Sequence, residues 1–509
     1  MESATPTSPE EKPSSPAAAE VSPAARRPGP HSRRLHLFLH GLAGAMLVLA
    51  VIVPGWFIEL APCWIALRQP LAAAGVILAL LGWLTYRPRL ARLSAGFCVA
   101  VMMLIVVLTG ADVLFRVIGY DFDRQQAALR HLPPFYRRPS VRTGEIYFRR
   151  PGPQVWTGKV IAGAVEALHL QTDFYRDEHP ITVRYDAQGF RNDPPLSDWE
   201  IAVAGDSFTE LGFLPQDRLF TTLLAEKLGV RVRNLGVSHT GPLTQLHYLR
   251  TYGLAPSTRR VAIAFYEGND LDNLDLKYSQ WRRFRKTGWR PAGLFHPQTS
   301  LLRAIGQAIL RADVRHSPPN EVVPDAFLHL GGRTIPVSFD DVPVGSAEVA
   351  PETREALEYV FREYAAFARA HHVQPWLFYF PCKVRVWHGM LEFNEKTRVD
   401  ASDWQPTDLP EYLRRLARGH GLYFVDLTPA LIRETRATQK LLFNPIVDTH
   451  FTALGSAVVA DELARVLRQV PPTARREVAT APPGKETAVH SPPRAAESAR
   501  DGSERLPEK

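Results

Sequence analysis

The sequence of 509 residues has only three cysteines, Cys63, Cys98 and Cys382, and no cysteine–histidine spacing of the kind that holds zinc. So few thiols exclude a disulfide framework, and we expect neither a metal site nor a cofactor. The chain also lacks a zinc finger, an RNA-binding signature and a basic helix. Its formal net charge of +8 is spread along the chain, and we therefore expect no nucleic-acid partner.

Apolar periodicity is missing at both ends of the chain. Residues 1–34 and 471–509 are rich in Pro, Ala, Ser, Glu and Arg. Such segments cannot bury enough apolar surface to offset the entropy of the chain. The sequence predicts a disordered tail at each end, whereas the overall hydrophobic fraction of 45% requires large cores between them.

Three long apolar runs lie within residues 35–119, at about 35–53, 70–86 and 94–119. A helix needs roughly 20 apolar residues to cross ~30 Å of hydrocarbon, and these runs hold few charges. We predict three transmembrane helices. A buried helical hairpin in a soluble core is the alternative, while a cleavable signal peptide fits poorly because two further runs follow the first.

The arginines around these runs indicate their direction. Four lie within residues 26–34, three lie within the second loop at 87–92, and the first loop has only Arg68. The positive-inside rule therefore places the N-terminus and the second loop in the cytoplasm. We expect a multi-pass protein of the cytoplasmic (inner) membrane, with everything after residue 119 in the periplasm or otherwise outside the cytoplasm.

From about residue 120 to 470 the composition is typical of a globular domain. Short β-branched or aromatic runs alternate there with helical patterns of 10–20 residues. The strand patterns lie at 201–205, 230–237, 260–266, 373–381 and 422–428, and the helical patterns at 220–228, 243–253, 351–372, 408–420 and 452–470. This alternation predicts an α/β domain at 201–470, with a parallel sheet covered on both faces. We expect residues 120–200 to form a lead-in that packs on this domain. The alternation breaks at 275–350, which we interpret as an insertion.

Small and polar residues follow the ends of the predicted strands. They are Gly205–Asp206–Ser207, then His239 and Gly241, then Gly268–Asn269–Asp270, and finally Asp448 and His450 before the last helix. Ligands of an α/β sheet bind at the carboxyl ends of its strands, which makes these residues candidates for a site. Each group also has an ordinary explanation, since Asp and Ser cap helices and Gly, Asn and Asp form turns.

In this order the motifs resemble those of the SGNH (GDSL) hydrolase family. The first block matches Gly205–Asp206–Ser207, the third matches Gly268–Asn269–Asp270, and the last matches Asp448 with His450. The resemblance covers about residues 180–470 and implies a three-layer α/β/α domain.

The chain departs from the family at two points. His239 stands where the second block usually has glycine, with Gly241 two residues later. The acid and histidine are spaced D-x-H, which is similar to alginate-type polysaccharide O-acetyltransferases, where the pair instead precedes the serine.

The resemblance implies a role for each of these residues. Ser207 is the nucleophile, His450 the general base, and Asp448 the group that orients the imidazole. The oxyanion hole comprises the Ser207 N–H, the Asn269 amide and the N–H of either His239 or Gly241. Gly205, Asp206, Gly268 and Asp270 support the strand ends on which these groups lie.

The implied activity is that of a membrane-anchored serine esterase or O-acyltransferase. It would act through an acyl-serine on an ester of an envelope or exported carbohydrate, and the motifs do not choose between water and a sugar hydroxyl as acceptor. An acyl donor from the cytoplasm would need a separate multispan partner. The alternatives are a catalytically silent SGNH-like subunit that binds glycan or scaffolds an export complex, and a transporter or acyl-donor channel whose function lies in the three predicted spans.

Overall fold

The computed structural model describes residues 134–136, 139–158, 180–288, 324–339, 341–394, 404–446 and 448–472, with scattered residues elsewhere. Nearly all of the two predicted tails and most of the three predicted spans lie outside the described residues. Among the residues that are described, no helix combines the length and the apolar character needed to cross a membrane. The three spans therefore stay a prediction from the sequence.

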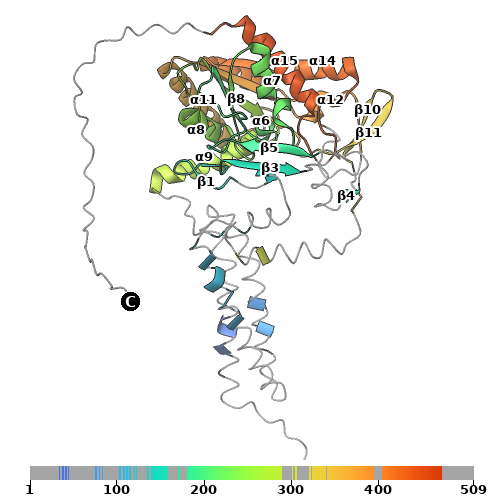
Figure 1. Ribbon diagram of the computed structural model, residues 1–509. Coiled ribbons are helices and arrows are strands. Elements are labelled where there is room, and N and C mark those ends of the chain that lie inside the picture. The colour runs from blue at the N-terminus through green and yellow to red at the C-terminus, as the bar shows by residue number, and fades with distance from the viewer. Residues whose placement is uncertain are drawn as a thin grey trace, which may run out of the picture.

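A five-stranded parallel sheet forms the centre of the domain (Figure 1). Its strands are β6 (Ile201–Gly205), β7 (Val232–Gly236), β8 (Arg260–Tyr266), β12 (Gln374–Phe380) and β14 (Tyr423–Asp426), in the order β14-β12-β8-β6-β7. Every residue of β6, β7 and β8 is buried. Continuous burial is expected of strands covered on both faces, and the predicted α/β fold with a parallel sheet is confirmed.

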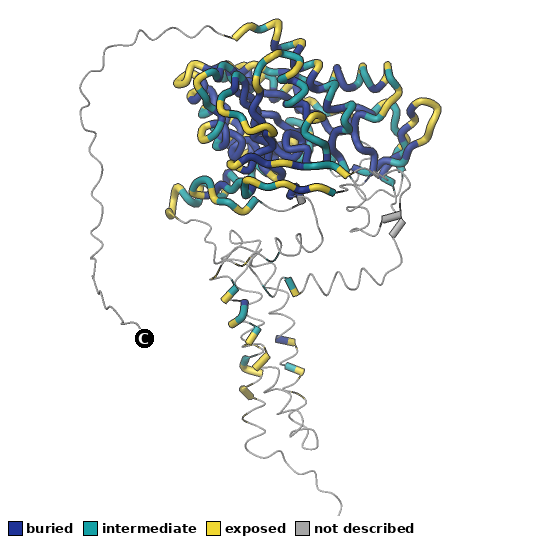
Figure 2. Tube along the Cα trace, viewed as in Figure 1, coloured by how far each residue is buried: buried dark blue, intermediate teal, exposed yellow. Residues whose placement is uncertain are grey.

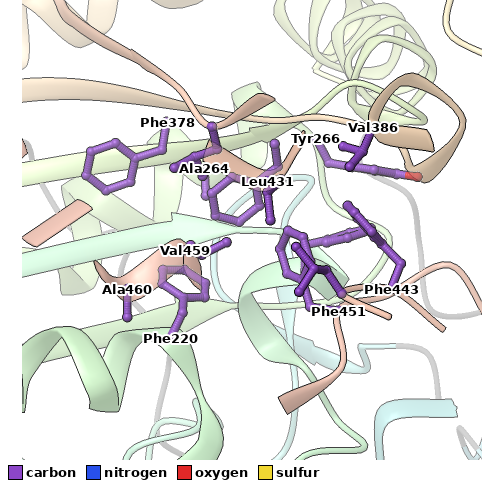
Figure 3. Packing of buried hydrophobic residues seen from close by; sticks show 14 of the residues in the cluster. Phe220, Ala264, Tyr266, Phe378, Val386, Leu431, Phe443, Phe451, Val459 and Ala460 are labelled. Carbon is purple, nitrogen blue, oxygen red and sulfur yellow. The ribbon is translucent and has the colours of Figure 1, made fainter. Parts of the chain in front are cut away.

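Helices cover both faces of this sheet, which gives three layers. Along β6, Ile201 and Val203 belong to one apolar cluster, whereas Ala202 and Ala204 belong to another, because successive side chains of a strand point to opposite faces. The first cluster includes residues of α7 (Phe220–Leu228), α14 (Thr428–Thr438) and α15 (Ala453–Gln469). The second includes residues of α8 (Pro242–Tyr252), α9 (Asp270–Thr287), α11 (Pro351–Ala370) and α13 (Leu409–Gly419). Figure 2 shows that buried residues fill the interior of the domain, and Figure 3 shows the aromatic packing of the first cluster.

Short elements surround the main sheet. The lead-in contains η2 (Pro134–Tyr136) and two antiparallel pairs, β1 (Val141–Arg142) with β2 (Phe148–Arg149) and β3 (Gln154–Gly158) with β5 (Ile181–Tyr185). Beyond the ends of β6 and β12 lie α6 (Ser207–Glu210), η3 (Gln216–Arg218) and α12 (Lys383–Trp387). A small pair joins β4 (Leu170–Gln171) to β9 (Asn320–Glu321).

The structure differs from the predicted start of the insertion at residue 275. Helix α9 continues to Thr287, and the basic stretch assigned to the insertion is the end of this helix. The helix was missed because it is very polar, with only Asp270, Leu271, Leu274 and Tyr278 buried. Later in the insertion, β10 (Ala326–Leu330) and β11 (Arg333–Val337) form a hairpin that β13 (Leu391–Phe393) extends.

Candidate active site

Ser207 lies where β6 ends and α6 begins. The Asp206 side chain caps this short helix by accepting a hydrogen bond from the Phe208 N–H at 2.9 Å, and the Ser207 hydroxyl donates to the same carboxylate at 3.4 Å. Two glycines let the helix sit directly on the strand ends. A Cβ on Gly205 would lie 2.0 Å from Thr209 Oγ1, and one on Gly236 would lie 2.4 Å from the Glu210 nitrogen. The nucleophile candidate is therefore fixed by backbone packing.

Asp448 and His450 meet as the sequence predicts. The Asp448 carboxylate lies 2.5 Å from His450 Nδ1, and it also accepts a hydrogen bond from the His450 backbone N–H at 3.3 Å. Burial alone would raise the pKa of Asp448, but the charge and hydrogen bond of His450, assisted by Lys383 and Asn444, hold this pKa below its usual value. The carboxylate therefore stays ionised and can orient the imidazole.

Buried hydrogen bonds stabilise the loop that carries Asp448 and His450. Lys383, at the start of α12, is buried and donates to the carbonyl oxygens of Asn444, Pro445 and Asp448 at 2.9 to 3.1 Å. The Asn444 amide donates to the other oxygen of the Asp448 carboxylate, and the Asn444 N–H donates to the His450 carbonyl. One lysine thus fixes the backbone on which both the acid and the base depend.

The imidazole of His450 packs against the helix that carries Ser207. Its ring centroid lies 4.7 Å from that of Phe208, the residue after Ser207, and 4.8 Å from that of Phe213. Burial dominates the pKa of Asp206, which is raised to about 6, although the Phe208 N–H and the nearby charge of His450 both lower it. Residues 243 positions apart in the sequence are therefore brought to the same end of β6.

Asn269 follows the neighbouring strand β8 and precedes α9. Between β6 and β8 the chain passes to β7 on the other side of β6, which makes this pair of strands the switch point of the sheet, where α/β proteins bind ligands. The Asn269 Oδ1 accepts a hydrogen bond from Asn273 Nδ2 at 3.1 Å. Because this bond occupies the oxygen, it sets which way the Asn269 NH2 group points.

His239 and Gly241 lie in different surroundings. His239 is exposed and adopts a left-handed backbone with φ of 62°. Gly241 is buried at the start of α8, where a Cβ would lie 2.8 Å from the Leu274 nitrogen and 2.9 Å from Asn273 Cβ. Gly241 therefore packs against the first turn of α9, the helix that begins one residue after Asn269.

Two carboxyl groups lie behind these turns. Asp206 and Asp270 are both fully buried. Burial and the neighbouring charge of Asp206 raise the pKa of Asp270 well above its usual value, although Gln245 and the Tyr266 N–H donate hydrogen bonds to it. Each carboxyl accepts a hydrogen bond from a backbone N–H of the turn at its strand end.

Several residues that shape the site carry no local signal in the sequence. Glu210 ends α6, is fully buried, and pairs with the equally buried Arg150 of the lead-in. Its carboxylate also accepts hydrogen bonds from the Tyr185 hydroxyl and from the N–H and hydroxyl of Ser238. Arg191, which precedes β6, is buried and donates hydrogen bonds to the carbonyl oxygens of Glu210, Leu211 and Leu214.

A cavity of about 930 Å³ opens beyond the end of β14, with Arg385, Thr407, Asp426 and Arg436 among its lining residues. Neither Ser207 nor His450 lines it. The site for chemistry is thus defined by the residues at the ends of β6 and β8 rather than by this cavity.

No protein-family model matches the chain, and no curated protein is significantly similar to it. Among solved structures, a lipolytic protein of the G-D-S-L family from Desulfitobacterium hafniense aligns over 53% of this chain and 99% of its own, with 12% identity and a TM-score of 0.27. An acetyl xylan esterase from Geobacillus stearothermophilus aligns over 55% and 97%, with 14% identity and a TM-score of 0.28. A GDSL-like lipase from Parabacteroides merdae aligns over 53% and 96%, with 12% identity and a TM-score of 0.29.

The resemblance of the chain to the SGNH hydrolases rests on the order of its sequence motifs. Identities and TM-scores of this size give no grounds for assigning an activity or a substrate to it. What the site itself provides is a hydroxyl at a helix start, an imidazole paired with an ionised carboxylate, and an amide at the adjacent strand end. This set of groups can perform acyl transfer through a serine.

Proposed function

We propose that the protein is a carboxylic ester hydrolase or O-acyltransferase that forms an acyl-serine at Ser207. The observation that carries the proposal is the close pair of Asp448 and His450, whose imidazole packs against Phe208 beside the nucleophile. His450 would take the proton from the Ser207 hydroxyl as it attacks the ester carbonyl, and then give it to the leaving alcohol. Asp448 would hold the Nδ1–H tautomer and stabilise the imidazolium.

The oxyanion would be bound by three donors. Two are the Ser207 N–H, one of the amides at a helix start that have no partner within the helix, and the Asn269 side-chain amide. For the third we favour the Gly241 N–H over that of His239, because Gly241 packs against the turn after Asn269 whereas His239 is exposed.

The proposed substrate is an ester of an envelope or exported carbohydrate, with water or a sugar hydroxyl as the acceptor. This substrate class is supported by the predicted membrane anchor and by the predicted position of the domain outside the cytoplasm. A multispan partner would be needed only for an acyl donor that comes from the cytoplasm. A silent glycan-binding subunit is the weaker alternative, because the chain has the serine, the asparagine and the histidine, and its imidazole is paired with an ionised carboxylate.

The proposal is tested with the full-length protein in detergent, an aryl acetate and a serine-reactive fluorophosphonate. We expect release of the aryl alcohol, labelling at Ser207, and resistance of the Ser207→Ala variant to the label. A second reaction that includes a sugar acceptor distinguishes hydrolysis of the acyl-enzyme from transfer of its acyl group, since only a transferase forms the acetylated sugar. An absence of both turnover and labelling would leave the silent-subunit alternative.

The predicted topology has its own test. Alkaline phosphatase fused after Val470 should be active in a bacterial host, because the enzyme folds to its active form only outside the cytoplasm. The same reporter fused after Arg92, in the second predicted loop, is the matched control and should be inactive. Activity in the second fusion with none in the first would reverse the orientation.

A further inference from the structure

Phe135, in the lead-in, forms part of the wall around His450. It lies in η2 and is only 8% exposed. Its ring meets that of Phe213 edge-on, with centroids 4.4 Å apart, and meets the His450 imidazole edge-on at 5.8 Å. The residue thus comes from 72 positions before Ser207 and contacts the proposed base directly.

Arg150 fixes the position of Phe135. Its buried guanidinium donates to the Pro134 carbonyl at 2.7 Å and to the Phe135 carbonyl at 3.0 Å. The same guanidinium forms a two-pronged ion pair with Glu210, in which one N–O distance is 2.9 Å. Burial would raise the pKa of Glu210, but Arg150 and the hydrogen bonds of Ser238 and Tyr185 hold it below its usual value, so that the pair is charged.

This ion pair joins the lead-in to the nucleophile helix. Glu210 is the last residue of α6, which begins with Ser207. Just beyond the helix, a Cβ on Gly212 would lie 2.2 Å from the Cβ of Phe135, which shows that Phe135 sits directly on the backbone there. One continuous set of contacts therefore runs from Ser207 through Glu210, Arg150 and Phe135 to His450.

We propose that Phe135 is a positioning residue that, together with Phe208 and Phe213, holds the His450 imidazole in line with Ser207. The inference rests on the proposed function. The bond from Nδ1 to Asp448 fixes one point of the imidazole but leaves the ring free to turn about that bond. Aromatic rings packed on its faces and edge remove this freedom, and displacement of a reacting group by about 1 Å can cost roughly 10²-fold in rate.

The test compares purified full-length variants with an aryl acetate. Phe135→Ala should lower kcat by roughly 10- to 100-fold with little change in KM, because the substrate still binds but the base is misaligned. Phe135→Leu, which keeps most of the apolar volume, should recover most of kcat. Phe213→Ala should resemble Phe135→Ala, and the double variant should lose less than the product of the two single losses, since both rings act on one imidazole.

Val183→Ala is the matched control. Val183 is fully buried in the same small cluster as Phe135, and its truncation should lower thermal stability without lowering kcat, as measured below the melting temperature of every variant. If Phe135→Ala does not fold, the variants Phe135→Leu, Phe135→Met and Phe135→Val replace it. The loss of kcat should increase in that order. Unchanged kcat at position 135, or the same loss in Val183→Ala, would overturn the inference. Because wild-type turnover and labelling at Ser207 are measured in the same experiment, failure of the proposed function is recognised separately.

Discussion

Ser207→Ala should leave the protein with almost no esterase activity, and His450→Ala should do the same. For a serine and histidine that act as one unit, each single loss lowers kcat by on the order of 10⁶, and the double variant loses little more. The reason is that the hydroxyl is a weak nucleophile without its base, and the base has nothing to activate without the hydroxyl. The measurement is kcat of the two single variants and the double variant on an aryl acetate. Each rate is corrected for spontaneous hydrolysis.

Asp448→Asn should be milder, with a loss on the order of 10⁴ in kcat, because the nucleophile and base remain while the imidazole loses its orientation and charge support. Ser456→Ala serves as the control for serine replacement. Ser456 lies in the first turn of α15 and is buried, and its hydroxyl donates to the carbonyl of Arg218 at the end of η3, outside the proposed chemistry. Normal activity in Ser207→Ala would be incompatible with an acyl-serine, whatever the Ser456→Ala variant does.

The strands of the sheet and the helices that cover it could be predicted because the sequence pattern of each element is local. The pattern at 260–266 coincides with β8, and the pattern at 220–228 coincides with α7. A buried parallel strand is a short continuous apolar run, and the helices that cover it are amphipathic, so each element is recognisable by itself. The pairing of Asp448 with His450 was also predictable, because alternate residues of an extended segment face the same way.

The contacts that align the site could not be predicted in this way. Arg150 and Glu210 are 60 residues apart, and the Lys383 amine holds the backbone of Asp448 65 residues away. An arginine or lysine in the sequence looks the same whether it is solvated or buried against a carboxylate, since only the fold decides its partner. Phe135 is likewise an ordinary aromatic residue in a Pro-rich stretch until the lead-in is folded onto α6.

Asn269→Ala should lower kcat by about 10²–10³-fold, the usual effect of removing one oxyanion-hole donor. The side chain is half-buried, does not cap α9 and accepts a hydrogen bond from the Asn273 side chain, so we expect little change in melting temperature. Asn273→Ala is the informative companion. It leaves the Asn269 amide in place but removes the hydrogen bond that sets its direction. We expect kcat to fall only a few-fold, within the range of one hydrogen bond.

Kinetics on an aryl acetate together with thermal unfolding distinguish an oxyanion-donor role of Asn269 from a structural one. If Asn269→Ala loses stability in proportion to activity, the residue is a turn former at the end of β8 rather than an oxyanion donor, and the Ser207 and Gly241 N–H groups would have to stabilise the charge alone.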